Sequence, residues 1–141
     1  MIEVQELTEQ YVGAAAAIDR AVFPESPWGI ETFRNNMKNE YDHPVIALCD
    51  GIPAGYGILR QIDAGEILIL GVEESRRRQG VGGKILDALL DEANRGENIF
   101  LEVRASNEAA IRLYASRGFT EVARRRNYYK KPAEDAVIMM V

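Results

Sequence analysis

The sequence predicts a mixed α/β fold in a single domain, residues 1–141, with an antiparallel first half and parallel strands in the middle. Length and composition are the first indication, since 141 residues with 47% hydrophobic side chains suit one globular core. The second is that apolar residues alternate in some segments and recur at helical spacing in others. The third is a strand, a glycine-opened helix and another strand in succession, the order of a βαβ unit with parallel strands.

The first 40 residues predict one strand and two helices. Residues 2–7 alternate apolar and polar side chains, which indicates a strand. Thr8 can cap a helix over residues 9–21, because its hydroxyl can accept an orphan amide of the first turn. Residues 23–29 contain two prolines and a glycine, so we expect a loop there, followed by a helix over residues 30–38.

Three short apolar runs follow, over residues 45–49, 54–61 and 66–72. The first two are joined by Asp50-Gly51, a strong hairpin signal, and the last two by residues 63–65. This arrangement predicts an antiparallel meander.

The second half is predicted to begin with a helix and end with two strands. Gly118 stands where a helix-ending residue of left-handed conformation belongs. The expected elements are a helix over 81–93, a strand over 99–103, a helix over 108–116, and closing strands over 119–123 and 136–141 separated by residues 124–135.

Charge and cysteine content exclude several classes of protein. A formal charge of −5 argues against a broad nucleic-acid-binding face, which needs a basic surplus. Cys49 is the single cysteine, so no internal disulfide can form. No apolar run approaches the roughly 20 residues of a membrane helix, and the N-terminus lacks the features of a signal peptide. We therefore expect a cytoplasmic protein, a monomer or weak dimer, that binds neither nucleic acid nor membrane.

The glycine-rich stretch from Arg77 to Gly83 predicts an anion site. It lies between a predicted strand and an amphipathic helix, and a helix start presents unpaired amides and a partial positive charge. It is not a phosphate-binding loop of the Walker type, because Gly83-Lys84 is followed by Ile85, and its glycines do not match the dinucleotide fingerprint. The alternative is a tight turn beside a solvated basic run.

A second motif lies in residues 101–114. Glu102 stands in an otherwise apolar strand, where an ionisable group is costly unless it is paired or used. Asn107 opens a helix, and Tyr114 follows two turns later on the same helical face. Taken singly, Asn107 could be a plain helix cap and Tyr114 a core residue with a polar tip.

With these motifs the sequence resembles the GNAT acetyltransferase superfamily, and within it the RimI family of ribosomal-protein alanine N-acetyltransferases. The coenzyme signature Gln/Arg-x-x-Gly-x-Gly/Ala occurs as residues 77–82. The resemblance to the RimI family rests on Phe23-Pro24, Pro27-Trp28, residues 101–107, residues 110–119, residues 125–129 and residues 134–136. It implies a mixed sheet whose central parallel strands splay apart, flanked by about four helices.

The resemblance also implies a donor site for acetyl-CoA, without a metal. The pantetheine arm would lie in the gap between the splayed strands, and the pyrophosphate on the glycine-rich loop. The implied coenzyme-binding residues are Leu70, Gly71, Val72, Arg77, Arg78, Gln79, Gly80, Val81, Gly82, Gly83 and Asn107. Gly71 departs from the family, in which alanine is usual at this position.

By the same resemblance Glu102 is the general base, acting through a water, and Tyr114 the general acid that protonates the departing thiolate. A phenol has a reference pKa of about 10 and is therefore protonated at neutral pH. Attack should be direct, in a ternary complex, because Cys49 and His43 are poor candidates for a covalent nucleophile. Cys49 has apolar neighbours, and we expect His43 to be exposed.

The implied acceptor is the N-terminal amine, with alanine as first residue, of a small-subunit ribosomal protein or similar peptide. We expect Trp28, Tyr128 and Tyr129 to frame it, although Trp28 could instead staple the two early helices together. Two other functions stay open at this point. One is acetylation of internal lysines or of a small amine, and the other is a non-catalytic coenzyme-A-binding regulatory module.

Overall fold

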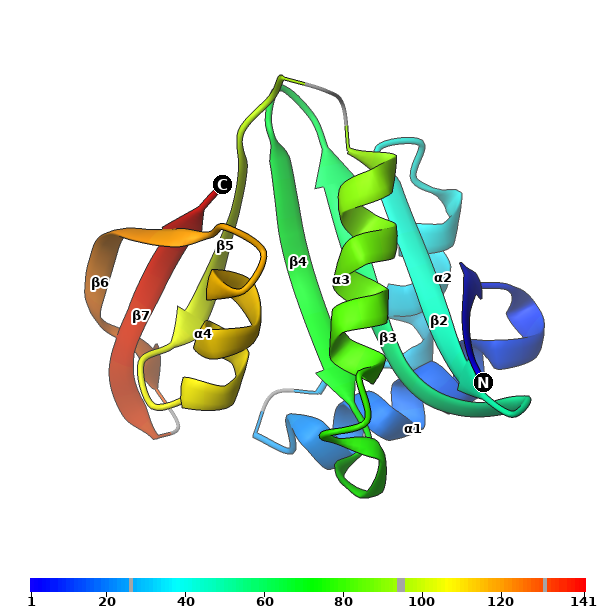
Figure 1. The fold of residues 1–141 in the computed structure, drawn as a ribbon. Coiled ribbons are helices and arrows are strands. Elements are labelled where there is room, and N and C mark those ends of the chain that lie inside the picture. The colour runs from blue at the N-terminus through cyan, green and yellow to red at the C-terminus, as the bar shows by residue number, and fades with distance from the viewer. Residues whose placement is uncertain (26, 94–95, 131) are drawn as a thin grey trace.

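The computed structural model describes residues 1–25, 27–93, 96–130 and 132–141. Within these ranges, seven strands form one mixed sheet in the order β1-β2-β3-β4-β5-β7-β6 (Figure 1). The strands are β1 (Ile2–Glu6), β2 (Asp42–Cys49), β3 (Ile52–Gln61), β4 (Gly65–Val72), β5 (Ile99–Arg104), β6 (Thr120–Lys130) and β7 (Ala133–Met140). The helices are α1 (Val12–Val22), α2 (Ile30–Lys38), α3 (Val81–Glu92) and α4 (Glu108–Ala115), with short 3-10 turns η1 (Glu9–Tyr11) and η2 (Glu74–Arg76). The predicted fold class is confirmed.

The antiparallel first half and the parallel centre of the sheet meet at β4. Strands β1 to β4 form the predicted meander, each antiparallel to the next. The pairing of β3 with β4 shifts register at Leu68, because Ile58 faces Ile69 while Leu59 faces Ile67. Such a bulge bends the strand that carries it. It marks the point beyond which β4 and β5 separate.

Helices cover both faces of the sheet. Helix α3 and Tyr114 of α4 pack over one face in a core that includes Ile85, Leu86 and Leu101. On the other face α1 and α2 pack over β2 and β3, in a core built around Phe33 and Tyr56. Figure 1 shows α3 in front of β3 and β4, and α4 in front of β5.

Helix α1 begins later than predicted. Residues 9–11 form a 3-10 turn, in which the Tyr11 amide donates to the Thr8 carbonyl at 3.0 Å. The Thr8 side chain makes no capping hydrogen bond. Short 3-10 turns are frequent at helix starts and satisfy the orphan amides with tighter bonds.

The prediction of a long loop over residues 124–135 is wrong. Strand β6 continues to Lys130 and β7 starts at Ala133, so the chain forms a long hairpin. Strand β6 is an edge strand, exposed along almost its whole length, so it lacks the alternation of apolar and polar residues that marks a half-buried strand. A register shift between Arg125 and Tyr129, with Asn127 at φ 51°, bends it near its end.

Helices of the described part of the chain are all too short or too polar to cross a membrane.

Candidate active site

The separation of β4 from β5 leaves one edge of β4 open. Parallel pairing joins only Gly65–Ile67 to Ile99–Leu101 within the described structure. Beyond it, Leu70, Gly71 and Val72 pair with β3 along their other edge. A strand edge that has no neighbouring strand presents backbone amides and carbonyls that can bond an extended ligand. The predicted coenzyme-binding segment of β4 therefore lies at this open edge.

Gly71 is required by a neighbouring side chain. A Cβ atom at this position would lie 2.7 Å from Cε1 and 2.8 Å from the hydroxyl oxygen of Tyr56. Tyr56 is its register partner on β3, and its side chain is buried. The departure from alanine at position 71 is thus explained by the tyrosine that fills the space.

The loop before α3 has the backbone geometry of an anion site. Arg78 and Gly80 have φ angles of 65° and 86°, and Gly80 is the N-cap of α3. The Lys84 amide donates to the Gly80 carbonyl at 3.1 Å, so the amides of the first turn precede the hydrogen-bond ladder. No acidic side chain lies in that turn, and the partial positive charge of the helix start is therefore available to a phosphate.

Gly82 and Gly83 also serve helix packing. A Cβ atom on Gly82 would lie 3.1 Å from Cδ2 of Leu113, and one on Gly83 would lie 2.5 Å from Nη2 of Arg117. Arg117, just beyond the end of α4, also pairs with Asp87 of α3, its Nε lying 3.0 Å from Oδ1. The two glycines let α4 approach the first turn of α3 closely.

Arg77 and Gln79 brace the loop from within. The Arg77 Nε donates to the Val72 carbonyl at 3.2 Å, and the Gln79 side-chain Nε2 donates to the Ser75 carbonyl at 3.2 Å. The Arg77 bond ties the loop to the end of β4, and the Gln79 bond ties it to η2. They hold the loop in shape, which is a different task from direct contact with a phosphate.

Asn107 caps α4, as one of its two predicted interpretations requires. Its side-chain oxygen accepts a hydrogen bond from the Ala110 amide at 3.2 Å. The cap uses the oxygen of the side-chain amide, whereas a coenzyme contact would use the nitrogen, which is a donor. The two roles are therefore compatible.

Glu102 lies in the middle of β5 on the face opposite α3 and α4. The strand alternates, so Ile99, Leu101 and Val103 are buried in the α3 core while Glu102 points away from it. Its side chain is 22% exposed, and Arg125 of β6 lies with Nε 3.8 Å from its Oε1. A half-buried carboxylate beside the open edge of β4 is placed to accept a proton from a group entering the gap.

Tyr129 links Glu102 electrostatically to Tyr114. Burial, together with a smaller effect of the nearby Tyr129 hydroxyl, raises the pKa of Tyr114 to about 12. Burial also raises the pKa of Tyr129, as does the charge of Glu102, while the Arg104 guanidinium lowers it. Tyr114 therefore carries its proton at neutral pH. Tyr129 thus interacts electrostatically with each of the two predicted catalytic residues, which lie on opposite faces of the sheet.

The β6–β7 hairpin is held against the site by Glu134, which the sequence analysis did not single out. Its carboxylate accepts hydrogen bonds from the Ser106 amide at 3.0 Å, the Ser106 hydroxyl at 3.1 Å and Arg104 Nη1 at 3.0 Å. The Arg104 guanidinium in turn lies 4.2 Å from the ring centre of Tyr129. Tyr128 is more exposed and packs edge-on against Tyr129. No local sequence pattern predicts this contact between distant segments.

Trp28 packs in the way that the stapling interpretation predicted. Its ring lies 5.7 Å from that of Phe33 on α2, and its backbone amide donates to the carboxylate of Asp19 on α1. Asp19 was also missed by the sequence analysis. A signal existed, because Val12, Ala15, Ala16 and Asp19 recur at helical spacing and place this acid on the buried face.

Cys49 and His43 lie away from Glu102 and Tyr114. Cys49 is buried in the α3 core at the end of β2. His43 is partly exposed near the start of the same strand, with Nδ1 3.9 Å from a Glu92 carboxylate oxygen. Among the residues that the structure describes, no group of three or more His, Cys, Asp or Glu side chains could hold a metal ion.

Comparison with known proteins identifies the family. Residues 6–119 match the family described as "Acetyltransferase (GNAT) family". This chain belongs to the GNAT acetyltransferase family. A GNAT enzyme takes its acetyl group from acetyl-CoA, and a first turn of α3 without acidic side chains is compatible with such a phosphorylated donor. The predicted enzyme class and acetyl donor are confirmed.

Two curated GNAT relatives are similar over most of this chain. The N-alpha-acetyltransferase RimI of Mycobacterium tuberculosis is 31% identical, over 98% of this chain and 90% of the relative. The [Ribosomal protein bS18]-alanine N-acetyltransferase of Escherichia coli is 40% identical, over 80% of this chain and 79% of the relative. A crystal structure of the ribosomal-protein-S18-alanine N-acetyltransferase from Escherichia coli superposes with a TM-score of 0.88 at 36% identity, covering 100% of this chain and 93% of that one. The resemblance to the RimI family is confirmed.

Proposed function

We propose that this enzyme transfers the acetyl group of acetyl-CoA to the N-terminal α-amine of a ribosomal protein whose first residue is alanine. Both the E. coli relative and its crystal structure are named for that reaction. Two observations support the chemistry: Glu102 is half-buried and directly follows the last β5 residue paired with β4, and Tyr114, with a pKa raised to about 12, carries its proton at neutral pH.

Each residue has a defined task in this proposal. The first-turn amides of α3 bind the pyrophosphate, and the open edge of β4 aligns the pantetheine arm by backbone hydrogen bonds. Glu102, through a water, accepts the proton that the amine gives up as its nitrogen bonds to the acetyl carbon. Tyr114 donates its proton to the sulfur as the carbon–sulfur bond breaks. An α-amine suits a single carboxylate base, because its pKa of about 8 is far below that of lysine, about 10.4.

The acceptor is tested with matched peptides and mass spectrometry. One peptide has a free N-terminal alanine and no lysine, and a second has a blocked N-terminus and an internal lysine. We expect acetylation of the first alone in the presence of acetyl-CoA. Acetylation of the internal lysine with the free N-terminus untouched would contradict the acceptor assignment and favour a lysine acetyltransferase.

The base is tested by Glu102→Gln with Glu66→Gln as its control. Glu66 lies on β4 on the same face, and its charge interacts with that of Glu102. We expect Glu102→Gln to keep acetyl-CoA binding by calorimetry and to lose about 10²–10⁴-fold in kcat, the usual contribution of a general base. Glu66→Gln should stay within a few fold of wild type. Equal losses in both variants would show that negative charge, rather than proton transfer, is what the reaction needs.

A further inference from the structure

Asp19 is a buried carboxylate that the proposed chemistry does not use. It is 0% exposed, in the core between α1 and the sheet. One of its oxygens accepts a hydrogen bond from the Tyr56 hydroxyl and the other from the Trp28 backbone amide. Burial raises the pKa of Asp19, and these two hydrogen bonds lower it. An acid is costly at such a position unless both oxygens are bonded, as they are here.

The Trp28 amide lies in a segment without regular structure. Pro27, Trp28 and Gly29, which we call the Trp28 turn, lead into α2, where the Thr32 amide donates to the Gly29 carbonyl at 3.1 Å. The hydrogen bond to Asp19 therefore ties this turn back onto α1. The aromatic rings continue the connection, since Trp28, Phe33 and Tyr56 pack in series at centroid distances of 5.7 and 5.4 Å.

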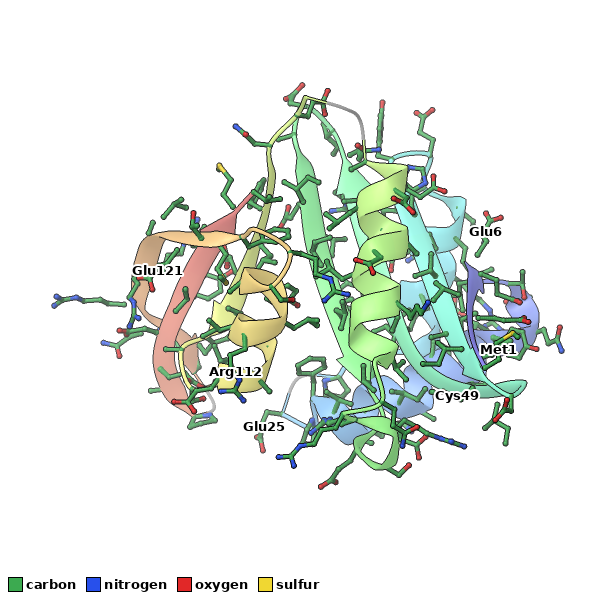
Figure 2. All side chains as sticks on the ribbon, viewed as in Figure 1. Met1, Glu6, Glu25, Cys49, Arg112 and Glu121 are labelled. Atoms are coloured by element: carbon green, nitrogen blue, oxygen red, sulfur yellow. The ribbon has the colours of Figure 1, made fainter. Side chains whose placement is uncertain are left out.

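The Trp28 turn is coupled to the open strand. Tyr56 fills the space over Gly71, the centre of the predicted coenzyme-binding segment of β4. The last turn of α1 also lies beside the start of the phosphate loop, across a depression lined by Ala21, Val22, Glu74 and Arg77. Figure 2 places Glu25, three residues before Trp28, below the open ends of β4 and β5. Tyr56 thus touches both the elements that hold the turn and the strand that borders the gap.

We propose that Asp19 is a positioning residue for the acceptor: its carboxylate, oriented by the Tyr56 hydroxyl, holds the Trp28 turn where it forms one wall of the acceptor site. This inference rests on the proposed function and on the sequence-based expectation that Trp28 helps to frame the acceptor. The affinity for the acceptor peptide then depends on a side chain that never touches it.

The test compares Asp19→Ala with Asp19→Asn. Alanine leaves the Trp28 amide and the Tyr56 hydroxyl without an acceptor. Asparagine can still accept from the Trp28 amide, while Tyr56 rotates its hydroxyl to accept from the new side-chain nitrogen. Asparagine should therefore rescue what alanine loses.

Asp42→Ala is the matched control. Asp42 is also a buried carboxylate, bonded to Arg60 and Asn36, but it begins β2, at the end of the sheet opposite the Trp28 turn. Asp42→Ala also removes a buried, hydrogen-bonded carboxylate, and should therefore destabilise the fold, but it removes no hydrogen bond to the Trp28 turn.

Two measurements separate positioning from general stability. We expect Asp19→Ala to raise KM for the alanine peptide at least tenfold, with KM for acetyl-CoA within twofold of wild type and Asp19→Asn within threefold on both. Trp28 is the only tryptophan, so fluorescence quenching by iodide reports the turn directly. Quenching should increase severalfold in Asp19→Ala and stay at the wild-type level in Asp42→Ala.

Equal iodide quenching in the two alanine variants, or a parallel rise of both KM values, would overturn the proposal. If Asp19→Ala does not fold, Tyr56→Phe removes only the hydroxyl and should raise the peptide KM about threefold, whereas an unchanged KM overturns the proposal. Quenching needs no turnover, so it tests the hold on the turn even if the wild-type enzyme leaves the alanine peptide unmodified. That last result would defeat the proposed function instead.

Discussion

Replacing Gly71 by alanine should destabilise the enzyme, although the backbone at this position suits any residue. The added methyl group would lie 2.7 Å from Cε1 and 2.9 Å from Cζ of Tyr56, where carbon atoms normally stay about 3.5–4.0 Å apart. Tyr56 is 1% exposed and its hydroxyl is bonded to Asp19, so its ring cannot swing away freely. Overpacking of this kind costs about 1–3 kcal/mol, and the lower entropy of the unfolded alanine chain offsets about 0.4–1 kcal/mol.

At the midpoints of these two ranges, about 2 and about 0.7 kcal/mol, the net expectation is a loss of about 1.3 kcal/mol in the free energy of unfolding. Urea unfolding followed by circular dichroism measures it, and thermal unfolding should show a Tm lower by about 2–8 °C. Gly13→Ala is the matched control, because a Cβ atom at that position of α1 has nothing within 4 Å. The same substitution there should stabilise the enzyme by about 0.5–1 kcal/mol.

A double-mutant cycle with Tyr56→Leu assigns the cause. Removing the ring removes the atoms that the new methyl group would meet. Gly71→Ala should therefore be better tolerated in the Tyr56→Leu background, with a coupling energy of about 1 kcal/mol or more. A Gly71→Ala variant as stable as wild type, or one equally destabilised in both backgrounds, would refute this reasoning.

Three further predictions concern the acid, the hairpin and stability at low pH. Tyr114→Phe should lower kcat about 10²-fold or more, and an unchanged kcat would contradict the acid assignment. Because burial raises the pKa of Tyr114 to about 12, the wild-type kcat–pH profile should show no loss from tyrosine ionisation below about pH 10. A decline there that Tyr114→Phe abolishes would contradict the raised pKa. Glu134→Ala should raise the peptide KM several-fold and increase proteolysis of the β6–β7 hairpin, because it removes the acceptor of Ser106 and Arg104; an unchanged proteolysis rate would count against it. Burial raises the pKa of Asp42, but hydrogen bonds from Arg60 and Asn36 outweigh it and leave the pKa below its usual value. The ionised Asp42 therefore stabilises the fold above about pH 4, where the unfolded group is also ionised, and this stabilisation is lost as pH falls further. Urea titrations should show a smaller loss of unfolding free energy at acid pH in Asp42→Asn than in wild type.

Much of the fold could be predicted from local pattern. The meander, the βαβ order and the helices over residues 81–93 and 108–116 match the structure within a few residues, because each half-buried element repeats its apolar side chains at its own period. Edge strand β6 has no buried face to impose that period, so the pattern of its Arg-rich segment predicts a loop instead of a strand.

The candidate site also has a part that local sequence predicts and a part that it does not. The anion loop, Glu102, Asn107 and Tyr114 stand out along the chain, because glycine before a helix and an acid within an apolar strand are local departures from pattern. The contacts of Glu134 with Ser106 and of Asp19 with Tyr56 join segments 28 and 37 residues apart. No local pattern encodes such pairs.

By itself, then, the sequence determined the fold class and the family and predicted which residues belong to the chemistry, since composition, periodicity and motif spacing are properties of neighbouring residues. Only the tertiary structure decided why position 71 is glycine, what holds the Trp28 turn, and how Tyr129 comes to lie near both Glu102 and Tyr114. Those outcomes depend on side-chain volume and hydrogen bonding between elements that become neighbours only when the helices pack onto the two faces of the sheet.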